Sequence, residues 1–232
     1  MNEIRFVLQI AADTSINVVK IGDATYNLAD AEIVDGYYVI TYVASPSKAA
    51  DDLVITARGD AGDHEILLGL EDYASAVLAD EALADAHNLV YAMVEYVELM
   101  SGKDVAVDAP EGYEAYVAAP EQAENAEGDL TLFAICHDET ITFAVMGKVG
   151  ANVVLTFVNG ETLEAAVDEN GAAVFEFSRV DLIADSFTFT VGEQTYTYSL
   201  ANYIFEQSNE DVIAKLRALY NYAAYAANYS NG

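Results

Sequence analysis

The sequence contains one cysteine, no tryptophan and three prolines in 232 residues. Because Cys136 has no second cysteine to pair with, the disulfide framework of small secreted domains is excluded. Stability must then come from packed cores, and a hydrophobic fraction of 53% supplies ample material for them. The composition therefore predicts a folded chain that does not depend on oxidation.

Basic residues are scarce: 9 lysines and arginines face 39 acidic residues, which gives a net charge of −30. Nucleic acid and anionic lipid are bound through lysine and arginine contacts to phosphate, so both are poor partners for this surface. The charge favours basic partners and divalent cations. We expect no cofactor, and weak, diffuse calcium binding. A halophilic origin of the charge stays an alternative to an extracellular one, because high salt screens the repulsion.

Long hydrophobic runs are missing as well. No stretch reaches the roughly 20 apolar residues of a membrane span. The first ten residues, MNEIRFVLQI, have neither a basic start nor a continuous apolar core, so they are not a signal peptide. If the protein is exported, the sequence is a piece of a longer protein with Met1 added.

What the chain does contain is an internal duplication. The phrase LEDYASAVL at residues 70–78 returns as LANYIFEQ at 200–207, and an alanine- and tyrosine-rich helix follows each. Upstream, the turn Asp35-Gly36 corresponds to Asn170-Gly171 at a separation of 135 residues (35 to 170), and Val18 corresponds to Val153. Self-similarity of this kind predicts a repeated structural unit.

The duplication predicts two tandem domains, residues 1–102 and 103–232. Short runs of β-branched and aromatic residues between turn signals predict antiparallel strands, and 3–4–7 spacing predicts helices after them. The fold class is thus α+β, with two β-sandwich units that each carry a C-terminal helical hairpin on the sheet. The predicted strands are 3–10, 16–21, 25–28, 37–43, 53–57, 65–68, 113–118, 130–136, 140–146, 151–158, 162–167, 172–178, 186–191 and 195–199.

Periodicity also predicts which residues are buried. Alternation places Tyr38, Ile40 and Tyr42 on one strand face. Helices are expected at residues 70–79, at 81–100 and from Ser208, an N-cap, onward. Asn159-Gly160 and Asn170-Gly171 predict type I′ hairpin turns. The apolar stripe of the second helix is Leu83, Ala86, Val90, Met93, Val94 and Val97, and that of the last helix is Ile213, Leu216, Tyr220, Ala223 and Ala227.

The two units differ in one strand. The first unit has no counterpart of residues 130–136. Either the sequence begins part-way into that unit, or the second unit supplies the strand that completes the first. The sequence leaves both alternatives open.

The repeated phrases resemble a recurrent module of secreted surface proteins from anaerobic gut Clostridia. The residues that match in the second unit are Tyr198, Ser199, Leu200, Asn202, Tyr203, Leu219, Asn221, Tyr222 and Ala223. In the first unit Gly69, Leu70, Asp72, Tyr73 and Tyr96 match, while Leu68 and Glu95 depart. The resemblance implies an extracellular, multi-domain, non-enzymatic context, and it transfers no catalytic residue.

Candidate catalytic and metal-binding residues are few. In the run Cys136-His137-Asp138-Glu139, neighbouring strand residues point to opposite faces, so the thiol and the imidazole cannot form a dyad, and a core Cys136 is favoured. His64 and His87 lack a second histidine at zinc spacing and are expected at the surface or its boundary. The acidic loops at residues 51–52, 60–65, 121–129 and 168–170 lack calcium-loop spacing.

Two features are candidate binding surfaces. The triplet Arg58-Gly59-Asp60 is expected in a loop between strands, where it could mimic an adhesion ligand. Among 16 tyrosines, Tyr222, Tyr225 and Tyr229 fall on the less apolar side of the last helix and could dock a neighbouring module or a ligand.

The sequence therefore predicts a non-catalytic extracellular surface module that serves adhesion, ligand binding or spacing. Its expected partners are surface proteins, glycans and neighbouring modules of the same protein. A glycan-binding domain that uses exposed tyrosines and a carboxylate-dependent hydrolase or enzyme accessory domain are the alternatives.

Overall fold

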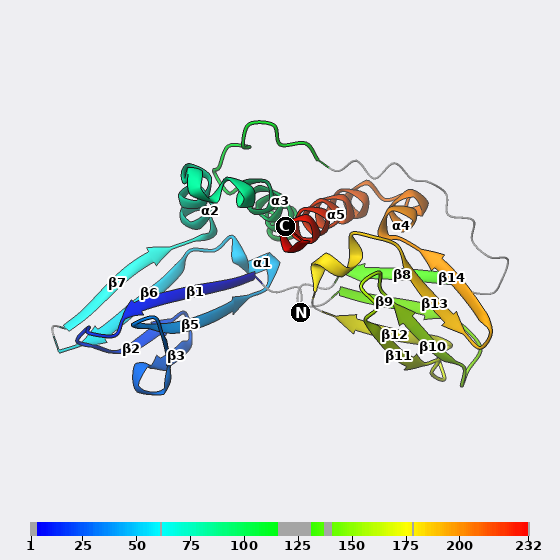
Figure 1. Ribbon diagram of the computed structural model, residues 1–232, viewed down its shortest axis with the longest axis horizontal. Coiled ribbons are helices and arrows are strands. Elements are labelled where there is room, and N and C mark those ends of the chain that lie inside the picture. Colours follow the sequence, from blue (N-terminus) through cyan, green and yellow to red (C-terminus); the bar gives the residue numbers. More distant parts are fainter. Residues whose placement is uncertain (1–3, 61, 116–130, 137–140, 178, 232) are drawn as a thin grey trace.

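The computed structural model describes residues 4–60, 62–115, 131–136, 141–177 and 179–231. It shows an α+β chain with four antiparallel sheets, two from residues 1–102 (the first half) and two from residues 103–232 (the second half) (Figure 1). The α+β fold class is confirmed.

In the first half a three-stranded sheet has the order β1-β5-β4 and a four-stranded sheet the order β3-β2-β6-β7. The strands are β1 (Ile4–Ala11), β2 (Ile16–Ile21), β3 (Ala24–Asn27), β4 (Glu32–Val34), β5 (Tyr37–Ala44), β6 (Leu53–Gly59) and β7 (Gly62–Leu68). Sequence reasoning missed β4, whose three residues are all exposed.

In the second half the corresponding sheets have the orders β8-β9-β12 and β11-β10-β13-β14. The strands are β8 (Thr131–Cys136), β9 (Ile141–Met146), β10 (Asn152–Thr156), β11 (Thr162–Ala166), β12 (Ala172–Phe177), β13 (Phe187–Val191) and β14 (Gln194–Tyr198). The two four-stranded sheets share one strand order: β3, β2, β6 and β7 of the first half take the same places as β11, β10, β13 and β14 of the second. The duplication is therefore one of topology as well as of sequence.

The three-stranded sheets differ at both edges: β4 pairs with the outer side of β5 in the first half, whereas β8 pairs with the outer side of β9 in the second. Strand β8 pairs with β9 inside the second half, which contradicts the alternative that the second unit lends this strand to the first. The counterpart of β9 is β1, which pairs with β5 on one side. Among the described residues no strand lies along its other side.

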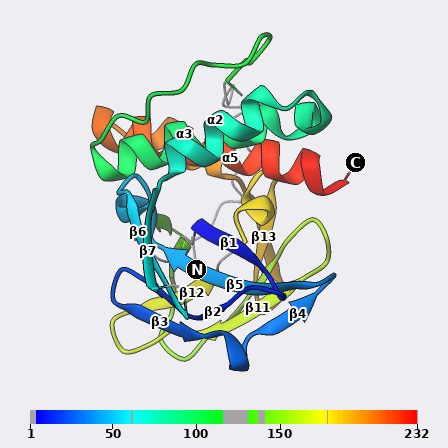
Figure 2. The same cartoon turned by 90° about the vertical axis from the view of Figure 1, so that its left-hand side faces the viewer.

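The helices gather on one side of the sheets, and α3 lies against α5 where the two halves meet (Figures 1 and 2). This contact between halves was not predicted. The helices are α1 (Pro46–Ala49), α2 (Leu70–Ala79), α3 (Ala84–Ser101), α4 (Leu200–Glu206) and α5 (Glu210–Asn231), with 3-10 turns η1 (Leu28–Asp30), η2 (Glu81–Leu83) and η3 (Val180–Ile183).

The helix ends follow local chemistry. The carboxylate of Asp72 accepts a hydrogen bond from the backbone N–H of Gly69 at 2.8 Å and caps α2. Gly102 ends α3 with φ +70°, a conformation that glycine adopts without strain. The N-cap of α5 is Asn209, whose side-chain oxygen accepts from the backbone N–H of Asp211 at 3.0 Å. The predicted cap, Ser208, is one residue too early.

The main core lies in the second half, where α5 packs over the sheets. Leu216, Leu219 and Ala223 of α5 are buried in a cluster with aromatic strand residues. In that cluster the ring centroids of Phe143 and Phe187 are 4.7 Å apart. The predicted stripe on α5 thus faces the core, whereas Leu83 of the earlier predicted stripe is exposed.

Three local predictions are wrong. The turn with positive φ at both central residues is Asp35-Gly36, at +50° and +85°, while Asn159 and Asn170 have negative φ and only the glycines after them are left-handed. The alignment of the two units paired Val18 with Val153, which is fully buried. A bulge between Ile16 and Val18 shifts the alternation in β2 by one residue, so the fully buried residue of β2 is Val19 instead of Val18. Residues 113–115 form no strand, and 116–118 lie outside the described residues.

Replacing Leu219 with alanine should cost about 2–5 kcal/mol of unfolding free energy, because the side chain is fully buried and the truncation leaves a cavity. Chemical denaturation measures this loss. The matched control is Arg217→Ala on the exposed side of the same helix, and equal losses for the two variants would contradict the packing of α5.

Candidate binding groove

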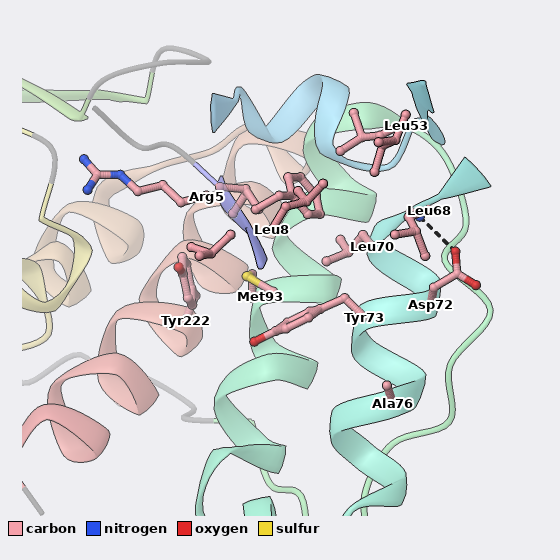
Figure 3. Close-up of a pocket in the computed structure, with 15 residues that line it drawn as sticks. Arg5, Leu8, Leu53, Leu68, Leu70, Asp72, Tyr73, Ala76, Met93 and Tyr222 are labelled. Atoms are coloured by element: carbon pink, nitrogen blue, oxygen red, sulfur yellow. Dashed lines mark hydrogen bonds between the residues drawn. The ribbon is translucent and has the colours of Figure 1, made fainter. Parts of the chain in front are cut away.

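An apolar cavity of about 630 Å³ lies in the first half beside the unpaired side of β1. Consecutive residues 4–8 of β1 line it, so the strand presents its edge to the cavity. The opposite walls come from Leu53 of β6, Leu68 of β7 and the first turns of α2, and Met93 and Tyr222 close the end (Figure 3). We call this cavity the β1 groove.

The polar side chains that line the groove are few. Asp72 caps α2 through its bond to Gly69. Arg5 is exposed, and its guanidinium extends away from the other labelled lining residues in Figure 3. The phenols of Tyr73 and Tyr222 complete the set. Such a lining suits an apolar occupant with backbone hydrogen-bonding groups.

The contact between α3 and α5 places Tyr222 at the groove. Tyr96 of α3 is fully buried and stacks on Tyr222 of α5, with ring centroids 6.1 Å apart and planes 23° apart. Tyr96 also belongs to the core cluster of the second half. The two halves therefore share a core at this point, and one wall of the β1 groove is donated by the second half.

The segment after α3 packs across the same two helices. Tyr113 makes an edge contact with Tyr91 at 4.7 Å and stacks on Tyr225 at 5.5 Å. Its hydroxyl donates to the carboxylate of Glu95, and burial together with that bond raises the pKa of Tyr113 well above its usual range. The hydroxyl of Tyr225 donates to the backbone carbonyl of Glu114 at 2.7 Å.

The three tyrosines predicted as a binding surface thus lie in different surroundings. Tyr222 lines the groove, Tyr225 packs against residues 113–114, and Tyr229 is exposed. Tyr73, which sequence reasoning did not select, lies near both Tyr222 and Tyr229, since each pair interacts electrostatically. The sequence signal that could have identified Tyr73 is its position in the repeated Leu-x-[Asp/Asn]-Tyr phrase.

The other adhesion candidate, Arg58-Gly59-Asp60, lies only partly in a loop. Arg58 and Gly59 end β6, and Asp60 begins the turn. Arg58 pairs with Asp63 at 3.1 Å. A side chain on Gly59 would meet the carbonyl oxygen of Ser15 at 2.3 Å, so close backbone packing requires this glycine.

The remaining candidates stay isolated. His64 is exposed, and His87 lies within 3.0 Å of the backbone carbonyl of Asp80. Cys136 ends β8, while His137, Asp138 and Glu139 fall outside the described residues. Within the described part of the chain, no three histidine, cysteine or acidic residues gather closely enough to hold a metal ion.

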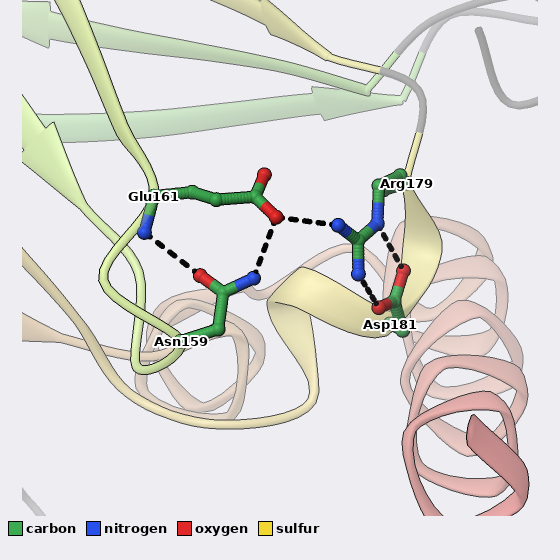
Figure 4. Close-up of polar contacts among 4 residues, drawn as sticks. All are labelled: Asn159, Glu161, Arg179 and Asp181. Atoms are coloured by element: carbon green, nitrogen blue, oxygen red, sulfur yellow. Dashed lines mark hydrogen bonds and ion pairs between the residues drawn. The ribbon is translucent and has the colours of Figure 1, made fainter. Parts of the chain in front are cut away.

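A network of charged side chains joins a turn to η3 at the surface of the second half (Figure 4). The guanidinium of Arg179 pairs with the carboxylates of Glu161 and Asp181, and Asn159 donates to Glu161 at 2.8 Å. The bond to Asp181, more than the other contacts, raises the pKa of Arg179. These groups pair with one another at the surface, where ion pairs contribute little to stability.

A comparison with protein-family models gave no match, and neither did a comparison with curated protein sequences. Among the described helices, none is long and apolar enough to cross a membrane.

The half-buried phenol of Tyr222 makes stability fall at high pH. Burial, with smaller contributions from Tyr73 and Asp181, raises the pKa of Tyr222 to about 12, against an ordinary value of 10.0. The folded state then holds the proton more tightly, so the contribution is complete below pH 10 and is lost as the pH rises towards 12. By linkage, the loss amounts to about 1.4 kcal/mol at pH 11.

Denaturation of the unmodified chain and of Tyr222→Phe at pH 8 and pH 11 checks this expectation. The unmodified chain should lose about 1.4 kcal/mol more than the variant over this interval. Equal losses would show that the phenol titrates normally.

Proposed function

We propose that the chain is a non-catalytic binding module of a larger bacterial surface protein and works outside the cell. In this proposal it consists of two tandem antiparallel β-sandwich units, residues 1–102 and 103–232, each with a C-terminal helical hairpin on its sheet. The first unit carries the binding site and the second holds it rigidly.

The observation that carries the proposal is the β1 groove. It is apolar, has a volume of about 630 Å³, and lies between a sheet edge and a helix. A cavity of this size and lining falls in the range of ligand-binding sites. The buried stack of Tyr96 on Tyr222 favours this role for the second unit, because it holds Tyr222 of that unit at the end of the groove.

The extracellular setting is supported by the resemblance to surface modules and by the charge. A net charge of −30 repels nucleic acid and anionic lipid, two common intracellular partners. The duplicated topology, with its shared strand order, is typical of modules that proteins repeat along a chain.

Glycan binding is the second candidate. Tyr73, which lines the groove, and Tyr229 of α5 are both exposed, and Tyr229 contributes to raising the pKa of Tyr73. Flat aromatic faces bind sugar rings, so this pair offers a platform. The two candidates differ at Tyr229: a glycan would contact Tyr229 as well as Tyr73, whereas an apolar ligand would lie within the cavity, which Tyr229 does not line.

An array of glycans and surface glycoproteins tests the module. We expect saturable binding of at least one member without chemical change of the ligand. Ala76→Arg should abolish binding in the groove, because Ala76 lines it from an exposed position on α2. Ser75→Arg, one residue away and outside the lining, is the matched control.

Tyr229→Ala separates the two candidates, since it should weaken only a glycan ligand. Turnover of any array member would contradict the non-catalytic role. Silence across the array would contradict the binding role and leave a spacer.

A further inference from the structure

The β1 groove occupies the place that a strand fills in the second half. The sheet registers show the correspondence: Ala11 pairs with Tyr37 as Met146 pairs with Ala172, and Phe6 pairs with Tyr42 as Ile141 pairs with Phe177. Both correspondences keep the separation of 135 residues. Strand β1 is therefore the counterpart of β9.

Strand β9 has a neighbour on each side. It pairs with β12 on one side and, through six antiparallel residue pairs, with β8 on the other. Strand β8 also lies against α4, the counterpart of α2. In the first half the corresponding space, between β1 and α2, is the β1 groove.

Residues beside the groove are exposed, whereas their counterparts in the second half are buried. Val7 is 57% exposed and its counterpart Thr142 is 6% exposed. Leu68 and Tyr73 are 41% and 48% exposed, and their counterparts Tyr198 and Tyr203 are both 8% exposed.

Inward-facing residues of β1 show the same difference. Phe6, Leu8 and Ile10 are partly buried, whereas their counterparts Ile141, Phe143 and Val145 are fully buried. The residues that are less buried than their counterparts thus lie around the groove, on β1, β7 and α2. This is the pattern expected if one strand were removed.

We propose that the β1 groove binds an extended strand of another polypeptide, which pairs antiparallel with residues 6–11 and completes the sheet. This inference rests on the proposed binding role and names the partner. An unpaired strand edge offers a row of N–H and C=O groups that an added strand satisfies, while its side chains enter neighbouring pockets. Exposed apolar residues beside such an edge mark it as a site for strand addition.

The chemistry of the occupant follows from β8 and from the charge around the groove. The sequence of β8, TLFAIC, has no charged residue over the six paired positions. Exposed acidic residues Asp52, Glu71 and Asp72 stand at the α2 end, where Asp52 lies beside Gly69. With the net charge of −30, they favour a strand flanked by lysine or arginine. The occupant is thus an uncharged, apolar strand of about six residues between basic flanks.

A labelled peptide, KKTLFAISKK, tests the proposal against the whole chain by fluorescence anisotropy, with serine in place of the cysteine. We expect saturable binding, and new protection of the β1 amides from hydrogen exchange in the complex. Two control peptides follow: one with proline at the third and fifth positions of the strand, which lacks the N–H donors, and one with aspartate flanks. The proline peptide should not bind, and the aspartate peptide should bind at least about tenfold more weakly, a difference of about 1.4 kcal/mol.

On the protein side, Ala76→Arg should weaken peptide binding at least about tenfold, and Ser75→Arg should leave it unchanged. Equal affinity for the proline peptide, or equal affinity of both variants, would overturn strand addition. Concentration-dependent dimers that Ala76→Arg abolishes and the peptide does not displace would also overturn it, because the occupant would then be a second copy. If the peptide fails while array ligands still bind, the binding module survives and the strand inference alone is lost.

Discussion

The strands β1 and β9 each have one side that does not face their first partner strand, and in the second half β8 pairs with that side of β9. With β8 in place, Ile141, Phe143 and Val145 are fully buried and join a core that reaches α5. Among the described residues no such strand lies beside β1, and the core of the first half forms two smaller clusters. The β1 groove, its exposed rim and its affinity for a strand all follow from this difference.

The contact between α3 and α5 joins the first half to the core of the second. Tyr96 is buried in the core of the other half, and Tyr113 is held between Tyr91 and Tyr225. Burial of large aromatic surfaces is favourable, so this contact stabilises the arrangement of the two halves. It also fixes Tyr222 at the end of the groove, so a ligand there would contact both halves.

Sequence reasoning found most elements because their signals are local. The boundaries of β2 and α2 agree with the structure, and the face of Tyr38, Ile40 and Tyr42 is the inward one. It failed where long-range packing decides. The bulge at Ile16 depends on pairing with β6, and the burial of Tyr96 depends on a helix more than 100 residues later. The missing counterpart of β8 in the sequence indicated an incomplete sheet in the first half. That Tyr73 and Tyr222 line the groove could be seen only in the folded structure.

Site-resolved amide hydrogen exchange on the free protein tests the central claim most directly. Strand β1 pairs with β5 and strand β9 pairs with β12, so alternate amides of each should be protected. The account predicts that the other amides of residues 6–11 exchange fast, whereas those of residues 141–146 are protected by β8. Equal protection of the two strands would contradict an open edge on β1.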